Sequence, residues 1–263
     1  MRRIAVAATA PFGADVLERL AARHEIAFVL TRPDAPAGRG RALAPPPAKV
    51  AAERLGLRVL QPPRPEIENV DTVVVCAYGL LIPSSLLERA LWLNVHPSLL
   101  PRWRGAAPVE RAIMAGDTTT GVTIHRTVKE LDAGPIAAQG VFPIEEDDDA
   151  GVVFEHAAEV AADLLEGVLA EEEPQFEPQP DDGVTNAEKI TSKDRELDLG
   201  RPAEELVRTV RALSPHIGAR AKLHGRDVIV WRARADGDEF VPVEVQPAGK
   251  RRMSYEEFLR GVR

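Results

Sequence analysis

The sequence predicts an α/β protein with a doubly wound, mostly parallel sheet, followed by a smaller second unit. Two early segments, 4–8 and 26–30, are apolar throughout and are separated by a stretch with helical periodicity. Strands without hydrophobic alternation are typical of a parallel sheet whose two faces are covered by helices. The length of 263 residues exceeds the roughly 100–200 of one typical domain, which favours two unequal domains.

The remaining elements follow from apolar periodicity along the chain. Residues 10–13 should form a loop before a helix whose apolar positions Val16, Leu17 and Leu20 share one face. In the first part we expect helices at 15–22, 48–55, 84–90, 108–115 and 151–170, and strands at 58–60, 72–77, 91–95, 121–128 and 136–142. In the last two of these segments the hydrophobic pattern alternates, which is typical of paired strands. In the second part we expect helices at 202–213 and 255–262 and strands at 219–223, 228–233 and 240–245.

Two segments carry no predicted helix or strand. Residues 31–47 are rich in Pro, Gly and Arg, and loops of this length are usually functional or disordered. Residues 171–183 contain four Glu, three Pro and two Asp, a composition typical of linkers. We therefore expect a catalytic domain at 1–172, a linker at 173–187 and a C-terminal domain at 188–263.

The net charge does not exclude an RNA partner. It is −8 overall, but residues 145–182 contain fifteen Asp or Glu and no Lys or Arg. The segments on either side, 1–144 and 183–263, carry net charges of +4 and +3. Most of the protein is therefore basic and compatible with a nucleic acid, from which the acidic segment should face away.

Composition also indicates a compartment. No apolar run approaches the roughly 18 residues of a membrane span, so we expect no membrane partner. The one cysteine, Cys76, lies in an apolar strand, which predicts a buried thiol in a reducing cytoplasm. The start, Arg2 and Arg3 before an apolar stretch, resembles a signal peptide only superficially because that stretch is short.

A candidate site follows the predicted strand 91–95. This strand ends in Asn94 and His96, and ligands of a doubly wound sheet bind at the carboxyl ends of its strands. Residues two apart in an extended segment point to the same side, so the amide and the imidazole can face one substrate atom. Asp132, in a turn between two predicted strands, is the strongest charged candidate to complete the group. This combination suits chemistry in which an oxyanion forms at a carbonyl.

Each of these residues also has an ordinary alternative role. A His after a strand is often a hydrogen-bonded structural residue, and Asp before Gly is most often a turn former. His125 is assigned a structural role because no polar residue is spaced to work with it, and the same applies to His24, His156, His216 and His224. No metal-ligand spacing or P-loop is visible, so neither a metal nor ATP is expected.

The whole string from Asn94 to Pro108, NVHPSLLPRWRGAAP, closely resembles the signature of the folate-dependent formyltransferases. The later segment LDAGP, with Asp132, is similar to the place of the catalytic Asp in that family. The resemblance implies the formyltransferase fold and 10-formyltetrahydrofolate as co-substrate. It implies that Asn94 donates to the formyl oxygen and that His96 stabilises the oxyanion and helps to move the proton. Asp132 would orient His96 and hold a water.

The same resemblance implies a folate site made mainly of main-chain groups. In the family the SLLP segment borders the folate, and the main chain of two loops holds the pteridine. Matched to this sequence, the folate-binding residues are Gly79, Leu80, Leu81, Ser98, Leu99, Leu100, Pro101, Lys129, Glu130 and Leu131. Because main-chain groups do the binding, the loop side chains are free to vary.

Two further stretches resemble the methionyl-tRNA formyltransferase branch. Residues 31–43, TRPDAPAGRGRAL, are similar to a loop inserted against the acceptor end of initiator tRNA, and 246–258 to that branch's carboxyl end. This implies methionyl initiator tRNA as partner and Phe12 beside the methionine side chain. It also implies tRNA contacts by Arg39 and Arg41, since arginines between glycines can reach phosphates or base edges. An ordinary solvated loop is the alternative.

The resemblance leaves the second domain and the substrate less defined. The family's C-terminal domain is an OB-like barrel of five strands, but about three strand signals follow residue 215, so we expect a reduced barrel, closed or open. The rival functions are a nucleotide-sugar N-formyltransferase, with the same three catalytic residues, and a catalytically inactive tRNA-binding module. We expect a monomer.

Overall fold

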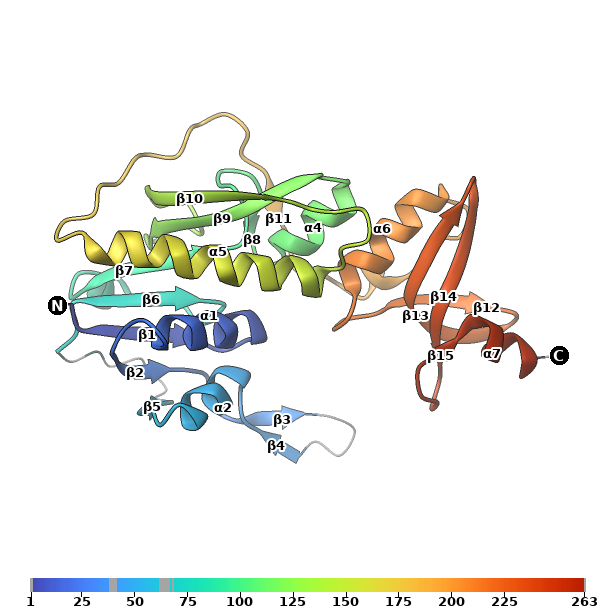
Figure 1. The fold of residues 1–263 in the computed structure, drawn as a ribbon, viewed down its shortest axis with the longest axis horizontal. Helices are drawn as coiled ribbons and strands as arrows, with labels where there is room; N and C mark the ends of the chain where they lie inside the picture. Colours follow the sequence, from blue (N-terminus) through green and yellow to red (C-terminus); the bar gives the residue numbers. More distant parts are fainter. Residues whose placement is uncertain (1, 38–41, 62–66, 68, 263) are drawn as a thin grey trace. The chain divides into compact units, whose positions relative to one another are not determined.

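The computed structural model describes residues 2–37, 42–61, 67 and 69–262, which form two compact units (Figure 1). The first unit comprises Met1–Arg104, Gly121–Val141 and Glu155–Val184. The second comprises Gly105–Thr120, Phe142–Phe154 and Thr185–Arg263. Two short stretches from the middle of the chain therefore group with the C-terminal part. Among the described residues, no helix is both long and apolar enough to cross a membrane.

The central sheet has seven strands in the order β10-β9-β7-β6-β1-β2-β5. Their bounds are β1 Ile4–Ala8, β2 Ile26–Leu30, β5 Val59–Leu60, β6 Thr72–Cys76, β7 Leu91–His96, β9 Thr119–Arg126 and β10 Ile136–Pro143. Neighbours from β5 through β7 are parallel, whereas β9 runs antiparallel to β7. The chain winds outward from β1 to both sides, which confirms the doubly wound, mostly parallel sheet.

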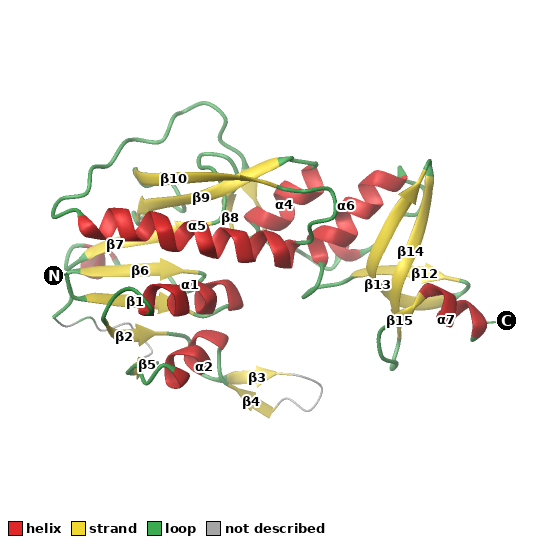
Figure 2. Cartoon of the chain, viewed as in Figure 1, coloured by secondary structure: helices red, strands yellow, loops and turns green. Residues whose placement is uncertain are grey.

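Both faces of this sheet are covered, which explains its uninterrupted apolar strands. Every residue of β1 and β6 is buried. Ala5 and Val73 on one face pack in a cluster with Leu86, while Val6 and Val74 point to the other face and are fully buried as well. Figure 2 shows the helices of this part of the chain, which are α1 Pro11–Ala21, α2 Pro47–Arg54, α3 Ser84–Leu87 and α5 Ala150–Ala170.

Two predicted helix bounds were wrong by three residues or more. Helix α1 begins at Pro11 and includes residues expected to form a loop, because proline without its N–H is tolerated in the first turn. Gly13 permits the close packing of that turn, since a Cβ there would lie 2.4 Å from the Cys76 carbonyl oxygen. Helix α3 ends at Leu87, three residues before the predicted end. Cys76 itself is buried, as predicted, and burial raises the pKa of its thiol.

The predicted loop 31–47 contains a short hairpin. Strands β3 (Ala35–Ala37) and β4 (Ala42–Ala44) are antiparallel, with Pro36 opposite Leu43. The Leu43 side chain is 72% exposed, so the hairpin does not bury it in the core. Arg39 and Arg41 lie outside the described residues.

The second unit contains an antiparallel sheet in the order β12-β13-β14-β15. Its elements are α4 Pro108–Ala115, β8 Arg104–Gly105 at the unit's boundary, β11 Asn186–Ala187, α6 Ala203–Leu213, β12 Ala219–Leu223, β13 Arg226–Asp236, β14 Glu239–Pro247, β15 Met253–Ser254 and α7 Tyr255–Arg260. Val210 of α6 and Phe258 of α7 pack with Val230 and Val245 of the sheet. Within the described chain β12 and β15 do not pair, so this sheet is open and does not close into a barrel. Strands β13 and β14 are longer than predicted, and most of the added residues are polar and exposed and therefore carry no apolar signal in the sequence.

Candidate active site

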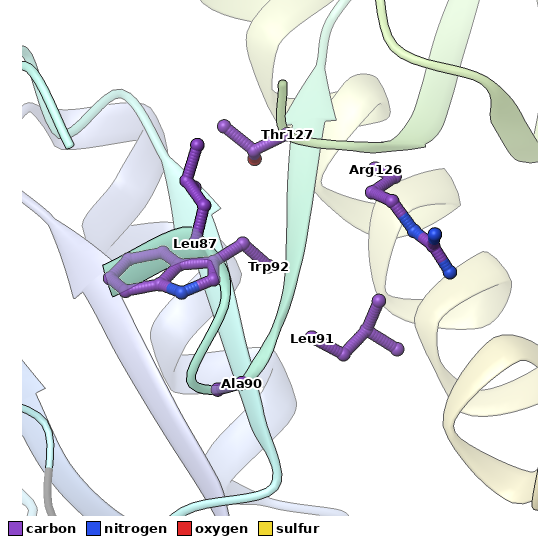
Figure 3. Close-up of a pocket in the computed structure, with 6 residues that line it drawn as sticks. All are labelled: Leu87, Ala90, Leu91, Trp92, Arg126 and Thr127. Atoms are coloured by element: carbon purple, nitrogen blue, oxygen red, sulfur yellow. The ribbon is translucent and has the colours of Figure 1, made fainter. Parts of the chain in front are cut away.

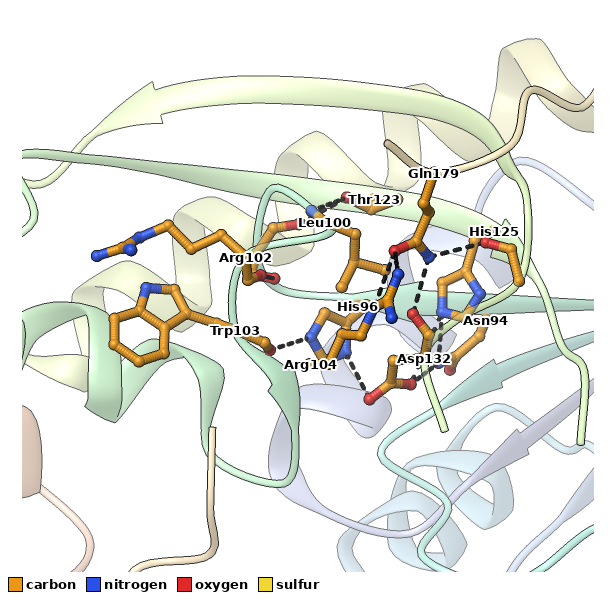
Figure 4. Close-up of polar contacts among 12 residues, drawn as sticks. Asn94, His96, Leu100, Arg102, Trp103, Arg104, Thr123, His125, Asp132 and Gln179 are labelled. Carbon is orange, nitrogen blue, oxygen red and sulfur yellow. Dashed lines mark hydrogen bonds and ion pairs between the residues drawn. The ribbon is translucent and has the colours of Figure 1, made fainter. Parts of the chain in front are cut away.

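The structure brings together the three residues that the sequence selected (Figure 4). The Asn94 side chain donates from Nδ2 to Oδ1 of Asp132 at 3.1 Å. The other carboxylate oxygen, Oδ2, lies 3.6 Å from Nδ1 of His96. His96 is 4% and Asp132 8% exposed, so the carboxylate and imidazole interact out of bulk water, where electrostatic interactions are strong.

Local backbone geometry explains how Asp132 reaches the end of β7. Asp132 has φ 50°, a left-handed conformation that Asp tolerates better than most residues. Two residues later, a Cβ on Gly134 would lie 1.7 Å from the carbonyl oxygen of Arg126, so only glycine fits the close return of the turn. The LDAGP segment is thus a tight turn that also carries the site's carboxylate.

Both nitrogens of the His96 ring face oxygen atoms. Nε2 lies 2.8 Å from the backbone oxygen of Trp103, which can only accept, so Nε2 carries a hydrogen. Nδ1 faces the Asp132 carboxylate on the opposite edge. The ring is therefore held between the loop after β7 and the turn between β9 and β10, which fixes its plane.

His125 also contacts this group, so the expectation that no polar residue is placed to work with it was wrong. In the antiparallel pairing of β7 and β9, His125 lies opposite Asn94, and its Nε2 is 3.0 Å from Asn94 Nδ2. The same Nε2 is 3.8 Å from Oδ1 of Asp132. The two strands were predicted, but the pairing register between them was not, and that register is what places His125 in the site.

Burial keeps His125 neutral. It lowers the pKa of the imidazole to about 4, against an opposing effect of Asp132. Nδ1 lies 3.1 Å from the Arg126 carbonyl oxygen and therefore carries the single ring proton. Nε2 then accepts from Asn94, so the two N–H groups of the Asn94 amide point to His125 and Asp132. Neutral His125 thus sets the orientation of the Asn94 side chain.

Acidification should destabilise the fold through His125. Because its folded-state pKa lies below its ordinary value, the unfolded chain binds the proton first, and stability is lost as the pH falls from about 6.5 to about 4. Between pH 7 and pH 4, the wild type should lose up to about 3 kcal/mol of unfolding free energy relative to His125→Gln. Urea unfolding at each pH measures it. The exposed His156→Gln is the control, and a pH-independent difference for His125→Gln would contradict the lowered pKa.

The residues assigned to folate fall into two groups. Ser98, Leu100 and Pro101 are buried, and Leu99 is half-buried. Their contacts are internal, since Ser98 Oγ donates to the Arg102 carbonyl oxygen at 2.7 Å and the Leu100 N–H donates to Thr123 Oγ1 at 3.0 Å. This segment is therefore held in place by hydrogen bonds within the first unit.

The two loops of the second group are open to solvent. Leu81 is 96% and Leu131 73% exposed, unusual values for leucines. Gly79, Lys129 and Glu130 are exposed too, while Leu80 is half-buried.

A pocket of about 310 Å³ lies beside β7 (Figure 3). It is lined by Leu87, Ala90, Leu91, Trp92, Arg126 and Thr127. The backbone N–H of Thr127 donates to the Trp92 carbonyl oxygen, which extends the hydrogen bonding between β7 and β9. Along these strands Trp92 lies two residues from Asn94, and Thr127 lies two residues from His125. The Thr127 hydroxyl is buried without a hydrogen-bond partner in the described part of the chain.

Phe12 is only 6% exposed and lies in the first turn of α1. The predicted tRNA contacts, Arg39 and Arg41, fall outside the described residues. The structure therefore brings Asn94, His96 and Asp132 into contact and leaves the remaining assignments as predictions.

Comparison with known proteins assigns the chain to a family. Residues 2–169 match the formyl transferase model, and residues 189–241 match the model of the formyl transferase C-terminal domain. The chain belongs to the formyl transferase family. This formyltransferase is 47% identical over 249 residues to the methionyl-tRNA formyltransferase of Halorhodospira halophila, covering 89% of the chain and 80% of the relative. It is 40% identical over 290 residues to that of Paracoccus denitrificans, covering 99% and 97%.

Solved structures share its fold at low sequence identity. The methionyl-tRNA formyltransferase from Clostridium thermocellum superposes with a TM-score of 0.68 at 14% identity, covering 94% of this formyltransferase and 99% of that chain. WlaRD, a sugar 3N-formyl transferase crystallised in the presence of dTDP and 5-N-formyl-tetrahydrofolate, gives 0.69 at 15%, covering 95% and 99%. The fold alone therefore does not separate the two activities. The family uses folate.

Proposed function

We propose that this chain transfers the formyl group of 10-formyltetrahydrofolate to the α-amino group of methionyl initiator tRNA. The observation that carries the proposal is the contact of Asn94 and His96 with the Asp132 carboxylate at the carboxyl end of β7. The assignment of the acceptor is supported by relatives named methionyl-tRNA formyltransferase that align over nearly the whole chain.

The chemistry requires stabilisation of an oxyanion more than a strong base. An α-amino group with a pKa of about 7.7–8.0 is substantially neutral near pH 7 and can attack the formyl carbon. A new bond then forms from the amine nitrogen to that carbon, and the bond from the carbon to N10 of the folate breaks. We infer that one N–H of the Asn94 amide also donates to the oxyanion. His96 then helps to pass the amine proton to the departing N10.

Features of the site support a folate co-substrate. The exposed loops 79–81 and 129–131 offer main-chain donors and acceptors to a pteridine. The 310 Å³ pocket combines apolar side chains such as Trp92 with polar groups, among them Arg126 and the buried Thr127 hydroxyl, and this mixture suits a flat heteroaromatic ring with polar edges. The pocket lies beside β7 and β9, the strands that carry Asn94 and His125, and loop 129–131 directly precedes Asp132.

The segment between β3 and β4 is the proposed tRNA contact, through Arg39 and Arg41. Charge reversal by Arg41→Glu should raise the KM for methionyl-tRNA about tenfold, because a lost phosphate contact weakens RNA binding without touching the folate site. Steady-state kinetics with each substrate varied in turn measure this. The exposed Arg58→Glu, an equal charge change elsewhere, should leave both KM values near those of the wild type. Equal damage by Arg41→Glu to folate and tRNA binding would refute the assignment.

The rival acceptor is a nucleotide-linked amino sugar, because WlaRD, a sugar 3N-formyl transferase, has a similar fold. The test incubates the protein with 10-formyltetrahydrofolate and either methionyl initiator tRNA or amino sugars, and identifies the product by mass spectrometry. We expect formylmethionyl-tRNA. A formylated sugar as the main product would favour the rival. Specific tRNA binding without any product would favour an inactive binding module.

A further inference from the structure

A short part of the acidic segment after α5 is attached to the hairpin of β9 and β10. Three contacts hold it, all within the first unit. The Arg126 guanidinium carbon lies 4.3 Å from the ring centre of Phe176. Ile136 and Glu177 exchange two backbone hydrogen bonds of 2.7 and 2.8 Å. Gln179 then reaches the turn between the strands, so a segment with the composition of a linker lies against the active-site turn.

Gln179 binds the turn that carries Asp132 (Figure 4). Its Nε2 donates to the carbonyl oxygens of Asp132 and Gly134, each at 2.8 Å. Both amide hydrogens are therefore used on two carbonyls of the same tight turn, in which Asp132 adopts φ 50°. A left-handed residue costs conformational energy and persists only where the surroundings fix it. Gln179 provides two such restraints.

The oxygen of the same amide is bound to Arg104. Arg104 donates from Nε at 3.0 Å and from Nη2 at 2.5 Å to Oε1 of Gln179. A guanidinium can only donate, so the amide cannot flip without facing it with its own N–H groups. The orientation of Gln179 is thus determined from both ends.

This contact closes a ring of interactions around His96. Arg104 directly follows Trp103, whose carbonyl oxygen accepts from Nε2 of His96. On the other edge, Nδ1 of His96 faces Asp132. The Arg104–Gln179 pair therefore connects the two backbone segments that hold the opposite edges of the imidazole, and it sets the distance between them.

We propose that Gln179 is a positioning residue for formyl transfer, acting with Arg104 to hold the Asp132 turn against His96. The inference rests on the proposed function and adds the segment after α5 to the active site. Catalytic groups displaced by about 1 Å can lose about 100-fold in rate. We expect Gln179→Leu, of similar size but without hydrogen bonds, to lower kcat about 10- to 100-fold while KM for folate changes little.

Two further variants separate positioning from folding. Gln179→Glu keeps an acceptor for Arg104 but loses the paired donors to the turn, and it should lower kcat as Gln179→Leu does. Gln175→Leu is the matched control on the same segment, because the exposed Gln175 amide donates locally, to the Glu173 carbonyl oxygen at 3.2 Å. It should retain wild-type kcat. Thermal unfolding midpoints of all variants are compared with the wild type.

A second measurement needs no substrate. In protein carrying ¹⁵N-histidine, the ring resonances of His96 report its hydrogen bonds, and they should shift in Gln179→Leu but not in Gln175→Leu. Wild-type kcat together with unshifted His96 resonances in Gln179→Leu would overturn the proposal, as would an equal effect of Gln175→Leu. If the wild type does not formylate methionyl-tRNA, the proposed function fails, and the resonances alone decide the role of Gln179.

Discussion

Asp132→Asn should lower the single-turnover rate of formyl transfer by about 10²- to 10⁴-fold while the protein remains folded. The substitution keeps the volume of the side chain and can still accept from Asn94 through its amide oxygen. Its NH₂ group then faces Nδ1 of His96, which must become an acceptor. The ring loses the carboxylate that orients it, so proton movement and oxyanion stabilisation both suffer.

Rapid quenching of one turnover, with enzyme in excess over methionyl-tRNA, measures this effect separately from product release. Asp163→Asn is the control, because Asp163 is an exposed carboxylate on α5 that pairs with Arg23 and not with a residue of the site. It should leave the rate unchanged. A near-normal rate for Asp132→Asn would show that the carboxylate does not take part in the reaction.

Asn94→Ala should lower kcat by about 10²- to 10³-fold, the usual result of removing an oxyanion donor. The Asn94 amide supplies N–H groups to His125 and Asp132, so its loss also leaves two buried acceptors without their donor. We therefore expect a second effect, a decrease of about 1–3 kcal/mol in the free energy of unfolding. The KM for folate should change less than kcat, because the predicted folate contacts are main-chain groups of the two loops and not this amide.

Saturating steady-state kinetics and urea unfolding measure the two effects of Asn94→Ala independently. Asn186→Ala, at an exposed asparagine in β11, is the control and should alter neither. A kcat within a few-fold of the wild type would remove Asn94 from the catalytic group, even if stability fell as expected.

The parts of the fold that the sequence predicted best are those with one dominant signal. Residues Ile4–Ala8 and Ile26–Leu30 are strands at the predicted bounds. An unbroken apolar run of this length is typical of a strand that is buried on both faces of a parallel sheet. Helix Pro108–Ala115 begins at a proline and ends before Gly116, which adopts a left-handed conformation. The start of α1 was missed because Pro11 and Gly13 indicate a loop as readily as a first turn.

The candidate site divides in the same way. The two-residue spacing of Asn94 and His96 predicted that they face the same side, and the resemblance of residues 94–108 to the formyltransferase signature supported their assignment to the site. His125 lies 31 residues from Asn94, and only the register of two antiparallel strands brings them into contact. Gln179 is 47 residues from Asp132 and lies in a segment whose composition suggests only a linker. Such long-range pairs have no local pattern in the sequence.

The most direct test of the central claim is a competition for one formyl donor. The protein is supplied with limiting 10-formyltetrahydrofolate and equal concentrations of methionyl initiator tRNA and a nucleotide-linked amino sugar, and both formylated products are quantified over time. The account predicts that formylmethionyl-tRNA accounts for nearly all of the product, and that Asp132→Asn forms almost none. Formylation mainly of the sugar, or of methionyl-tRNA at equal rates by the wild type and Asp132→Asn, would contradict it.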